Sequence, residues 1–509
     1  MATFLPSHRR PAHGLSRRDF IRMTALGGGA AAAGVRSAAA ALESAGPPKK
    51  GATPVAIPIS AAAVIEGDLD RMFEDMTSRA GVNILMPFIY THEEHRAGVE
   101  KGPFRGGNYA TPHMQFYADT GLKYEDLRAP EFPKVDLFER VIPVAQRHGI
   151  RTFAWIIEDN HRPLAIAGWE GMYEVDTHGQ RAKGHPGGPC NRNPRYRALL
   201  RGLMEDYLTS YAVEGIMWGS ERQGGMLTAL GISQSGAPAD PGKVTCFCEF
   251  CQAAAKAEGI SVDRARKGFL EIEAFARACR SGPAPTDGYF TTFWRILLAY
   301  PEVLAWESLW VRGRHELEAE LYRHAKSVRP SALVGWHLWH NISFSPFQRA
   351  EEDYSVLKQF SDFLRPALYN NSAGERMRAF VDGARSGVFR DLSKEQALQL
   401  FYAQLGETGE ADYSKLGPEP LSAAYVERET RRAVKGVAGA ATQIWPGVDI
   451  DVPLSKKDSS RCTPESVGQA VAAAFHGGAE GIILSRNYIE MKPDNLSAAG
   501  AAMRGLGLL

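Results

Sequence analysis

Four cysteines have a spacing that could bind a metal ion. Cys246, Cys248 and Cys251 fall within six residues, and Cys190 lies upstream in a Gly-Gly-Pro-Cys-Asn stretch. Four thiolates can form a closed tetrahedral zinc site of the structural kind, which leaves no open position for a substrate. A disulfide pair or free thiols are the alternatives, although the short C-x-C-x-x-C spacing strains a disulfide between its own members. We therefore expect a structural zinc ion here and no organic cofactor.

Polar and aromatic side chains gather after, or inside, the short apolar runs of the chain. Parallel strands end at one face of a barrel, and barrel enzymes place their chemistry on that face, so these side chains are candidates for one shared site. The candidates with a carboxyl group are Glu158, Glu221, Asp449, Asp451 and Glu490. The other candidates are Trp218, Arg222, Trp339, His340, Asn341, Tyr369, Asn370, Trp445 and Arg486, with His337 as a further histidine beside them.

Two carboxyl groups on opposite sides of a glycosidic bond can cleave it by acid/base chemistry. One must carry a proton near neutral pH, so it needs apolar surroundings, and the other must stay ionised. Glu221 follows Trp218, which suits the proton-bearing acid. Asp449 is the predicted second carboxylate, although it could equally be a turn residue after Pro446. The remaining polar candidates, including Glu158, Asp451 and Glu490, are expected to bind substrate, with tryptophan faces stacking on sugar rings.

The apolar runs alternate with helical patterns. Strand-like runs occupy residues 82–88, 150–157, 213–219, 333–338, 363–369, 441–445 and 481–484. Helical periodicity occupies residues 136–145, 195–211, 262–279, 290–328, 394–405, 420–435 and 464–476. Seven strands, plus one that the pattern does not locate, predict a (β/α)8 TIM barrel with inserted loops and helices over residues 56–509. No G-x-G-x-x-G fingerprint follows a strand and no P-loop sequence occurs.

The first 40 residues have the features of a twin-arginine export signal. Arg17 and Arg18 precede a mild apolar run at residues 23–35, and small residues near Ala40 offer a cleavage site. Residues 41–55 are predicted to be a linker. The protein is therefore expected to be periplasmic or secreted, with the twin-arginine machinery as a partner and no membrane span after cleavage. With 59 basic and 58 acidic residues, the overall charge gives no reason to expect a nucleic-acid partner.

Four motifs follow one another in a fixed order: Val-Asp-Thr-His-Gly at residues 175–179, Cys-Asn-Arg-Asn-Pro-Arg-Tyr-Arg at 190–197, a strand ending in Ser-Glu at 213–221, and the C-x-C-x-x-C segment. This order resembles the barrel domain of glycoside hydrolase family 42, the β-galactosidase family with a four-cysteine zinc site. The resemblance implies a carbohydrate substrate, Glu221 as acid/base, and the four cysteines as zinc ligands. The chain departs from the family at Ser220, where the family has Asn, and in its seventh strand, which lacks a nucleophilic Glu.

Two other functions stay open from the sequence. His92, Glu93, Glu94 and His95 could serve a metal-dependent hydrolase, although their spacing differs from H-E-x-x-H. A non-catalytic carbohydrate-binding barrel would use the same polar and aromatic side chains without turnover. The sequence does not indicate the sugar, the anomer or the linkage.

Overall fold

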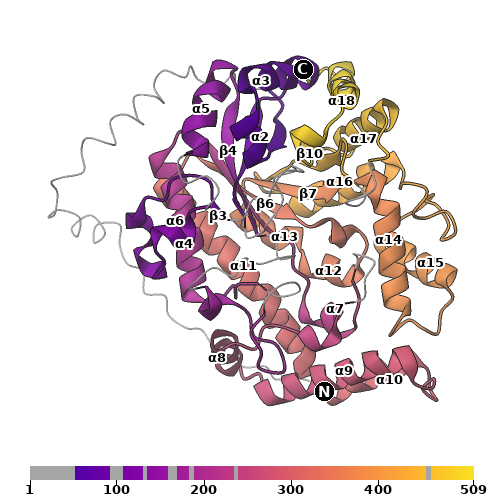
Figure 1. The fold of residues 1–509 in the computed structure, drawn as a ribbon. Helices are drawn as coiled ribbons and strands as arrows, with labels where there is room; N and C mark the ends of the chain where they lie inside the picture. Colours follow the sequence, from indigo (N-terminus) through magenta and orange to yellow (C-terminus); the bar gives the residue numbers. More distant parts are fainter. Residues whose placement is uncertain are drawn as a thin grey trace, which may run out of the picture. The chain divides into compact units, whose positions relative to one another are not determined.

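Parallel strands, drawn from most of the length of the chain, close into a central barrel (Figure 1). The computed structural model describes residues 52–91, 107–129, 135–158, 169–182, 188–233, 239–453 and 460–509. The barrel strands are β1 Val55–Ile59, β2 Ile84–Thr91, β4 Arg151–Glu158, β5 Gly215–Ser220, β6 Leu333–Leu338, β7 Phe363–Leu368, β8 Gln443–Ile444, β9 Gly447–Asp449 and β10 Ile482–Ser485. β8 and β9 both pair with β7 and share one place in the barrel, and β1 pairs with both β2 and β10, which closes it. The predicted (β/α)8 fold is confirmed.

The strand that the sequence pattern does not locate is β1. It is a run of only five residues, all buried, with Pro58 in its interior, and it begins at Val55, the last residue of the predicted linker. Proline is uncommon inside strands, so the pattern around it is weak. The two-residue strand β3, Gly107–Asn108, adds an antiparallel partner to the end of β2.

Helices surround the strands, and several match the predicted periodicity. Helix α10 ends at Ala299 and α11 begins at Glu302, so the predicted helix at residues 290–328 is two helices, because Pro301 cannot donate a backbone hydrogen bond. The helices are α2 Ala61–Glu66, α3 Leu69–Ala80, α4 Tyr124–Leu127, α5 Leu137–Arg147, α6 Pro194–Ser210, α7 Gly225–Ala229, α8 Glu249–Ala257, α9 Val262–Ser281, α10 Tyr289–Ala299, α11 Glu302–Val328, α12 Pro346–Glu351, α13 Tyr354–Leu357, α14 Asn370–Arg385, α15 Lys394–Leu405, α16 Ala423–Val437, α17 Pro464–His476 and α18 Pro493–Gly505.

Successive residues of each strand face opposite sides of the barrel wall, which separates an inner from an outer core. The inner core contains Ala56, Ile84, Met86, Phe88, Phe153, Trp155, Ile157, Met217, Phe363, Trp445 and Ile483. Trp218 and Trp336 belong to the outer core, between the strands and the helices, and their rings meet edge to face with centroids 6.1 Å apart. The parity of a residue within its strand therefore decides whether it can reach a site on the barrel axis.

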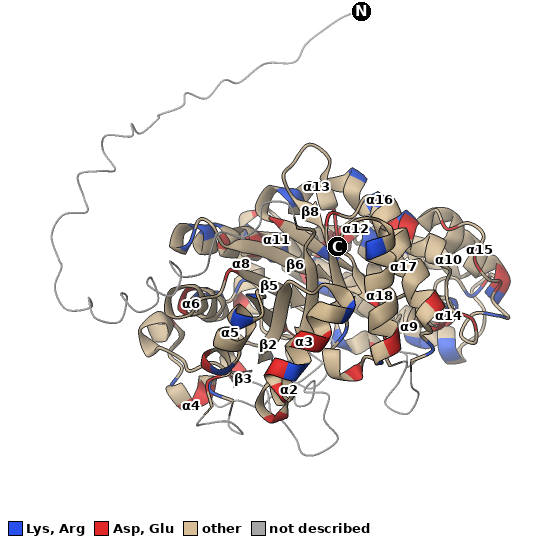
Figure 2. Cartoon of the chain, turned by 90° about the horizontal axis from the view of Figure 1, so that it is seen from above, with Lys and Arg blue, Asp and Glu red and all other residues tan. Residues whose placement is uncertain are grey.

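Charged residues of both signs are spread over the helices that surround the barrel (Figure 2). Among the described residues, no helix has the length and apolar character needed to cross a membrane.

Candidate active site

Glu221 lies one residue past the end of β5 and continues the inward-facing parity of Met217 and Gly219. Its side chain is 14% exposed, and its Oε1 lies 2.9 Å from Nε2 of His337 on β6. Gly219 is the register partner of His337, and a Cβ atom on that glycine would lie 2.5 Å from the Cβ atom of His337. The histidine therefore occupies space that β5 leaves free, and it brings its imidazole to the Glu221 carboxylate.

Arg365 on β7 is the next member of this chain of contacts. It is the register partner of His337, and its Nη1 lies 2.5 Å from Nδ1 of that ring. Its Nη2 donates to the hydroxyl groups of Ser485, at 2.7 Å, and Tyr369. The guanidinium is buried and lies 5.2 Å from the ring centroid of Trp155. Within the described part of the chain, it forms no ion pair with a carboxylate.

The residues after β6 form one wall of the mouth of the barrel. Trp339 is half-buried and is two residues beyond His337, whereas His340 and Asn341 are buried. Nε2 of His340 lies 3.1 Å from the hydroxyl group of Tyr425 on α16. Burial, assisted by nearby arginines, holds the pKa of His340 well below its usual value, so this histidine is neutral.

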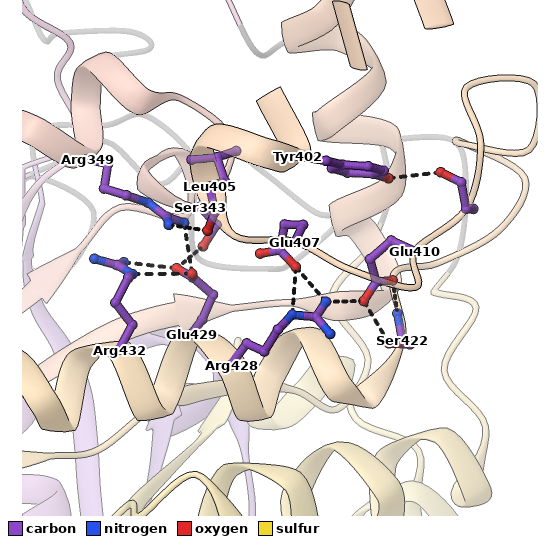
Figure 3. Close-up of polar contacts among 11 residues, drawn as sticks. Ser343, Arg349, Tyr402, Leu405, Glu407, Glu410, Ser422, Arg428, Glu429 and Arg432 are labelled. Atoms are coloured by element: carbon purple, nitrogen blue, oxygen red, sulfur yellow. Dashed lines mark hydrogen bonds and ion pairs between the residues drawn. The ribbon is translucent and has the colours of Figure 1, made fainter. Parts of the chain in front are cut away.

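A network of ion pairs around the buried carboxylate of Glu429 contacts the segment that follows Trp339 (Figure 3). Glu429 on α16 accepts hydrogen bonds from Ser343, at 3.2 Å, from Arg349, at 2.8 Å, and from Arg432, at 2.9 Å. Burial alone would raise the pKa of Glu429, but the two arginines outweigh it and the pKa is lowered. Arg349 also donates to the backbone carbonyl of Leu405, at 2.8 Å, at the end of α15. The segment that carries Trp339 is thereby tied to two helices.

Asp449, at the end of β9, is fully buried. Its Oδ1 accepts hydrogen bonds from the Val452 backbone amide, at 2.8 Å, and from Sγ of Cys462, at 3.1 Å, while Oδ2 has no hydrogen-bond partner among the described residues. Burial raises the pKa of Asp449 to about 7, against the effect of these two hydrogen bonds. This carboxyl group therefore carries a proton more readily than an ordinary aspartate.

Several predicted substrate-binding residues have structural partners instead. Asp451 accepts hydrogen bonds from the Lys492 backbone, at 2.8 Å, and from Asn495, at 2.9 Å, which fixes the start of α18. Arg486 and Glu490 form a two-bond ion pair with each other, at 2.6 and 3.0 Å.

Trp445 and Asn370 also have structural settings. Trp445 stacks on Phe363 within the inner core, near the amino end of β7, with ring centroids 4.2 Å apart. Asn370 begins α14 and donates to the Leu421 carbonyl, at 3.4 Å. Both side chains are buried, whereas Trp339 is half-buried.

Glu158, Arg222 and Trp218 have the outward parity and lie on the helix side of the barrel wall. Glu158 and Arg222 form an ion pair of 2.5 Å in which each side chain is only 1% exposed. Arg222 also contacts Glu174, at 3.3 Å. These positions do not support contact with a substrate on the barrel axis, and Trp218 does not form the apolar wall predicted for Glu221.

The four predicted metal-binding cysteines come together in one buried cluster. Their sulfur atoms all lie within 4.8 Å of one another, with Cys190 Sγ 3.6 Å from that of Cys251 and 3.5 Å from that of Cys248. A tetrahedral site with zinc–sulfur bonds of about 2.3 Å has sulfur–sulfur distances of about 3.8 Å, so the cluster fits such an ion. All six cysteines lie within the described residues and none forms a disulfide. The cluster is thus arranged to hold a metal ion.

Arg222 connects this cluster to the end of β5. Its guanidinium donates to the carbonyl of Pro189, at 2.7 Å, and to Oδ1 of Asn191, at 2.8 Å, the two residues that flank Cys190. The residue next to Glu221 in the sequence therefore holds the loop that carries the first cysteine. The alternative metal-binding residues from His92 to His95 lie outside the described residues, as does the predicted export signal.

Comparison with known proteins gives similarity of fold alone. No family model matches the sequence, and no curated protein matches it. Similar solved structures include the β-galactosidases from Rahnella sp. R3 (13% identity, TM-score 0.48, covering 90% of this chain and 57% of that one) and Halorubrum lacusprofundi (12%, 0.46, 90% and 58%). A β-N-acetylhexosaminidase is also similar (7%, 0.42, 89% and 72%). The chain thus spans less than two thirds of either β-galactosidase, and TM-scores below 0.5 assign no activity to it.

Proposed function

We propose that this chain is a glycoside hydrolase that cleaves an oligosaccharide or glycoside with the carboxyl groups of Glu221 and Asp449. The observation that carries the proposal is the position of Glu221. It is a partly exposed carboxylate just past the end of a strand, on the face where barrel enzymes place their chemistry. A buried histidine and a buried arginine hold it there. Such support from rigid strands is typical of a reacting group.

The substrate would be bound beside this carboxylate. Trp339 offers a half-buried aromatic surface for stacking on a sugar ring. The Tyr369 ring packs against Arg365, whose guanidinium carbon lies 5.4 Å from the centroid of that ring. The ring centroid of His340 lies 5.1 Å from that of Tyr369, so His340 and the adjacent Asn341 could offer polar atoms to hydroxyl groups, whereas Asn370 is held by the Leu421 carbonyl. The pairing of Arg486 with Glu490 makes these two the weakest members of the predicted binding set.

A non-catalytic carbohydrate-binding barrel is the second candidate, and one observation favours it. Asp449 is fully buried, and its Oδ1 is engaged by the Val452 amide and by Cys462. A carboxyl group that never reaches the substrate would leave Glu221 without a partner, and hydrolysis needs two such groups.

A panel of defined glycans and aryl glycosides, incubated with purified protein with and without a chelator, separates these functions. Chelator-insensitive hydrolysis of at least one member supports the glycoside hydrolase. Binding without turnover supports the carbohydrate-binding barrel, and turnover that the chelator abolishes supports a metal-dependent hydrolase.

We further propose that the four-cysteine cluster holds one structural zinc ion. Four thiolates would saturate the ion, so its contribution would be to fix the loops around Cys190 and Cys246, with no direct part in bond cleavage. Elemental analysis should find one zinc per chain, and Cys248→Ser should lower both the zinc content and the unfolding temperature. An intact cysteine–cysteine bridge with no metal would contradict this.

The proposed location of the mature protein is the periplasm or the exterior, reached by twin-arginine export. The proposal is supported by the Arg17-Arg18 pair and the mild apolar run that follows it. Replacing both arginines by lysine should leave the protein in the cytoplasm, as measured by cell fractionation. Unchanged export of that variant would refute the proposal.

A further inference from the structure

We infer that Glu221 works as an ionised carboxylate, a nucleophile or base, and that His337 and Arg365 are positioning residues that keep it so. This reverses the proton-donor role that the sequence suggests for Glu221. The chemical consequence rests on the proposed function, whereas the charge state can be measured without it.

The direction of the hydrogen bonds follows from Arg365. A guanidinium can only donate, so Nδ1 of His337, at 2.5 Å from Nη1, must accept. The hydrogen of the neutral imidazole is therefore on Nε2, which donates to Oε1 of Glu221 at 2.9 Å. A hydrogen bond donated to a carboxylate favours its ionised form.

The balance of charge leads to the same conclusion. Arg365 is 1% exposed, and a buried cation is costly unless an anion compensates it. Among the described residues, the hydroxyl groups of Tyr369 and Ser485 and the imidazole of His337 are its hydrogen-bond partners. The carboxylate at the end of that chain of contacts is Glu221, one imidazole away. An ionised Glu221 supplies the missing counter-charge.

The barrel wall is shaped around these two side chains. A Cβ atom on Gly219 would lie 2.5 Å from the Cβ atom of His337, and one on Gly447 would lie 2.6 Å from Nε of Arg365. Trp155 contacts both groups from the inner core, 6.0 Å from the His337 ring and 5.2 Å from the guanidinium. Glycine inside a strand often marks such a close approach, so the backbone fits this arrangement.

The other groups in this region also favour an anion. The electrostatic surroundings of His340 include Arg376 on α14, together with Arg365, Glu221 and His337, so these groups share one region. Two of them are cations, and the two histidines are neutral. The remaining nearby groups are the phenol of Tyr369 and the Asp449 carboxyl group on β9. Arg222, Glu158 and Glu174 lie on the opposite side of the barrel wall, where the arginine pairs with both carboxylates.

An ionised Glu221 needs a second group to give a proton to the leaving group. As a nucleophile, Glu221 would bond to the anomeric carbon while the bond to the leaving oxygen breaks, and that oxygen would take the Asp449 proton. Water would then hydrolyse the glycosyl ester and return a proton to Asp449. As a base, Glu221 would instead remove a proton from the attacking water. Burial raises the pKa of Asp449 to about 7, so it can carry the proton required in either case.

The leaving group tests the chemical role. Glu221→Gln should lose at least about 10²-fold in rate, both on a glycoside with a poor leaving group and on an activated aryl glycoside. A proton donor would behave differently, because an activated leaving group needs no proton. Retention of most of the activity on the aryl glycoside by Glu221→Gln would overturn the inference.

The charge state is tested without turnover, by carboxyl ¹³C NMR of glutamate-labelled protein. The Glu221 resonance is assigned by its loss in Glu221→Gln. Its chemical shift should be that of an ionised carboxylate at neutral and mildly acidic pH. In His337→Phe the pH midpoint of the Glu221 titration should rise by about 1–2 pH units, because the carboxylate loses one hydrogen bond to a charged group. His324→Phe is the matched control, because His324 on α11 lies 3.0 Å from Glu205 away from the barrel axis, and it should cause no shift.

A Glu221 chemical shift typical of a protonated carboxyl group near neutral pH would overturn the inference. A titration midpoint that is the same in His337→Phe and in the wild-type protein would also overturn it. The wild-type spectrum alone decides the first point if the His337 variant does not fold. If the resonance is ionised but no glycoside is cleaved, the proposed function fails and the charge assignment stands.

Discussion

Replacing Arg222 by methionine should destabilise the protein strongly at neutral pH and much less at acidic pH. Arg222 and Glu158 lie 2.5 Å apart on the helix side of the barrel wall, and each side chain is 1% exposed. Methionine fills a similar volume but removes the guanidinium. The Glu158 and Glu174 carboxylates would then be buried without the guanidinium, and the Pro189 carbonyl would lose a donor.

The size of the effect follows from the protonation of Glu158. Breaking a buried ion pair costs about 3–5 kcal/mol. The cost has a ceiling, because Glu158 can instead take up a proton, which from an ordinary glutamate pKa of about 4.3 costs about 3.7 kcal/mol at pH 7 and about 1 kcal/mol at pH 5. The orphaned carbonyl adds about 1 kcal/mol at either pH. From Glu158 and the carbonyl alone we therefore expect a loss of at least about 4–5 kcal/mol at pH 7 and about 2 kcal/mol at pH 5, to which the loss of the contact with Glu174 adds.

Urea unfolding at both pH values measures this loss. Arg312→Met is the control, because the ion pair of Arg312 with Glu258 has side chains 42% and 43% exposed and should contribute less than about 1 kcal/mol. The double variant Arg222→Met, Glu158→Gln should recover part of the loss at pH 7. A loss below about 1 kcal/mol at pH 7, or an equal loss at both pH values, would refute the reasoning.

Two further predictions concern the barrel axis. Gly219→Ala places a Cβ atom 2.5 Å from that of His337, so it should cost about 1–3 kcal/mol of stability and reduce turnover. The control is Gly505→Ala, whose added Cβ atom meets nothing within 4 Å and should have neither effect. Equal unfolding midpoints for the two variants would contradict this prediction. Burial raises the pKa of Asp449 to about 7 from an ordinary 3.8. The contribution of Asp449 to the free energy of unfolding is therefore fully present below pH 4 and is lost as the pH rises through 7, by on the order of 4 kcal/mol at most. Asp449→Asn should therefore flatten the stability profile between these pH values, and an unchanged slope would show that Asp449 titrates normally.

The local patterns of the sequence predict much of the secondary structure. The bounds predicted for α15 and α17 agree with the structure, because Ser393 and Thr463 form capping boxes that fix where these helices begin. Seven strands are found from their apolar runs. The eighth, β1, is missed because it is short, contains Pro58 and follows a segment without periodicity.

The composition of the site is harder to predict, because closeness in sequence misleads at a strand end. Trp218 and Arg222 flank Glu221 in the chain, but their parity places them on the other side of the barrel wall. The true neighbour, His337, is more than one hundred residues away, and Arg365 is brought to it only by the register of β6 with β7. A single arginine inside the apolar run at residues 363–369 is the one signal that could have revealed Arg365.

The most direct test of the proposed activity compares the wild-type protein with Glu221→Gln on the best glycan substrate of the panel. The variant should unfold at a lower temperature than the wild-type protein, because Arg365 loses its counter-charge, and a cooperative unfolding transition above the assay temperature establishes that it is folded. We predict that kcat/KM of the variant is lower by at least about 10²-fold, since the reacting carboxylate is gone. Equal kcat/KM values for the two folded proteins would contradict the assignment of Glu221 and, with it, the proposed active site.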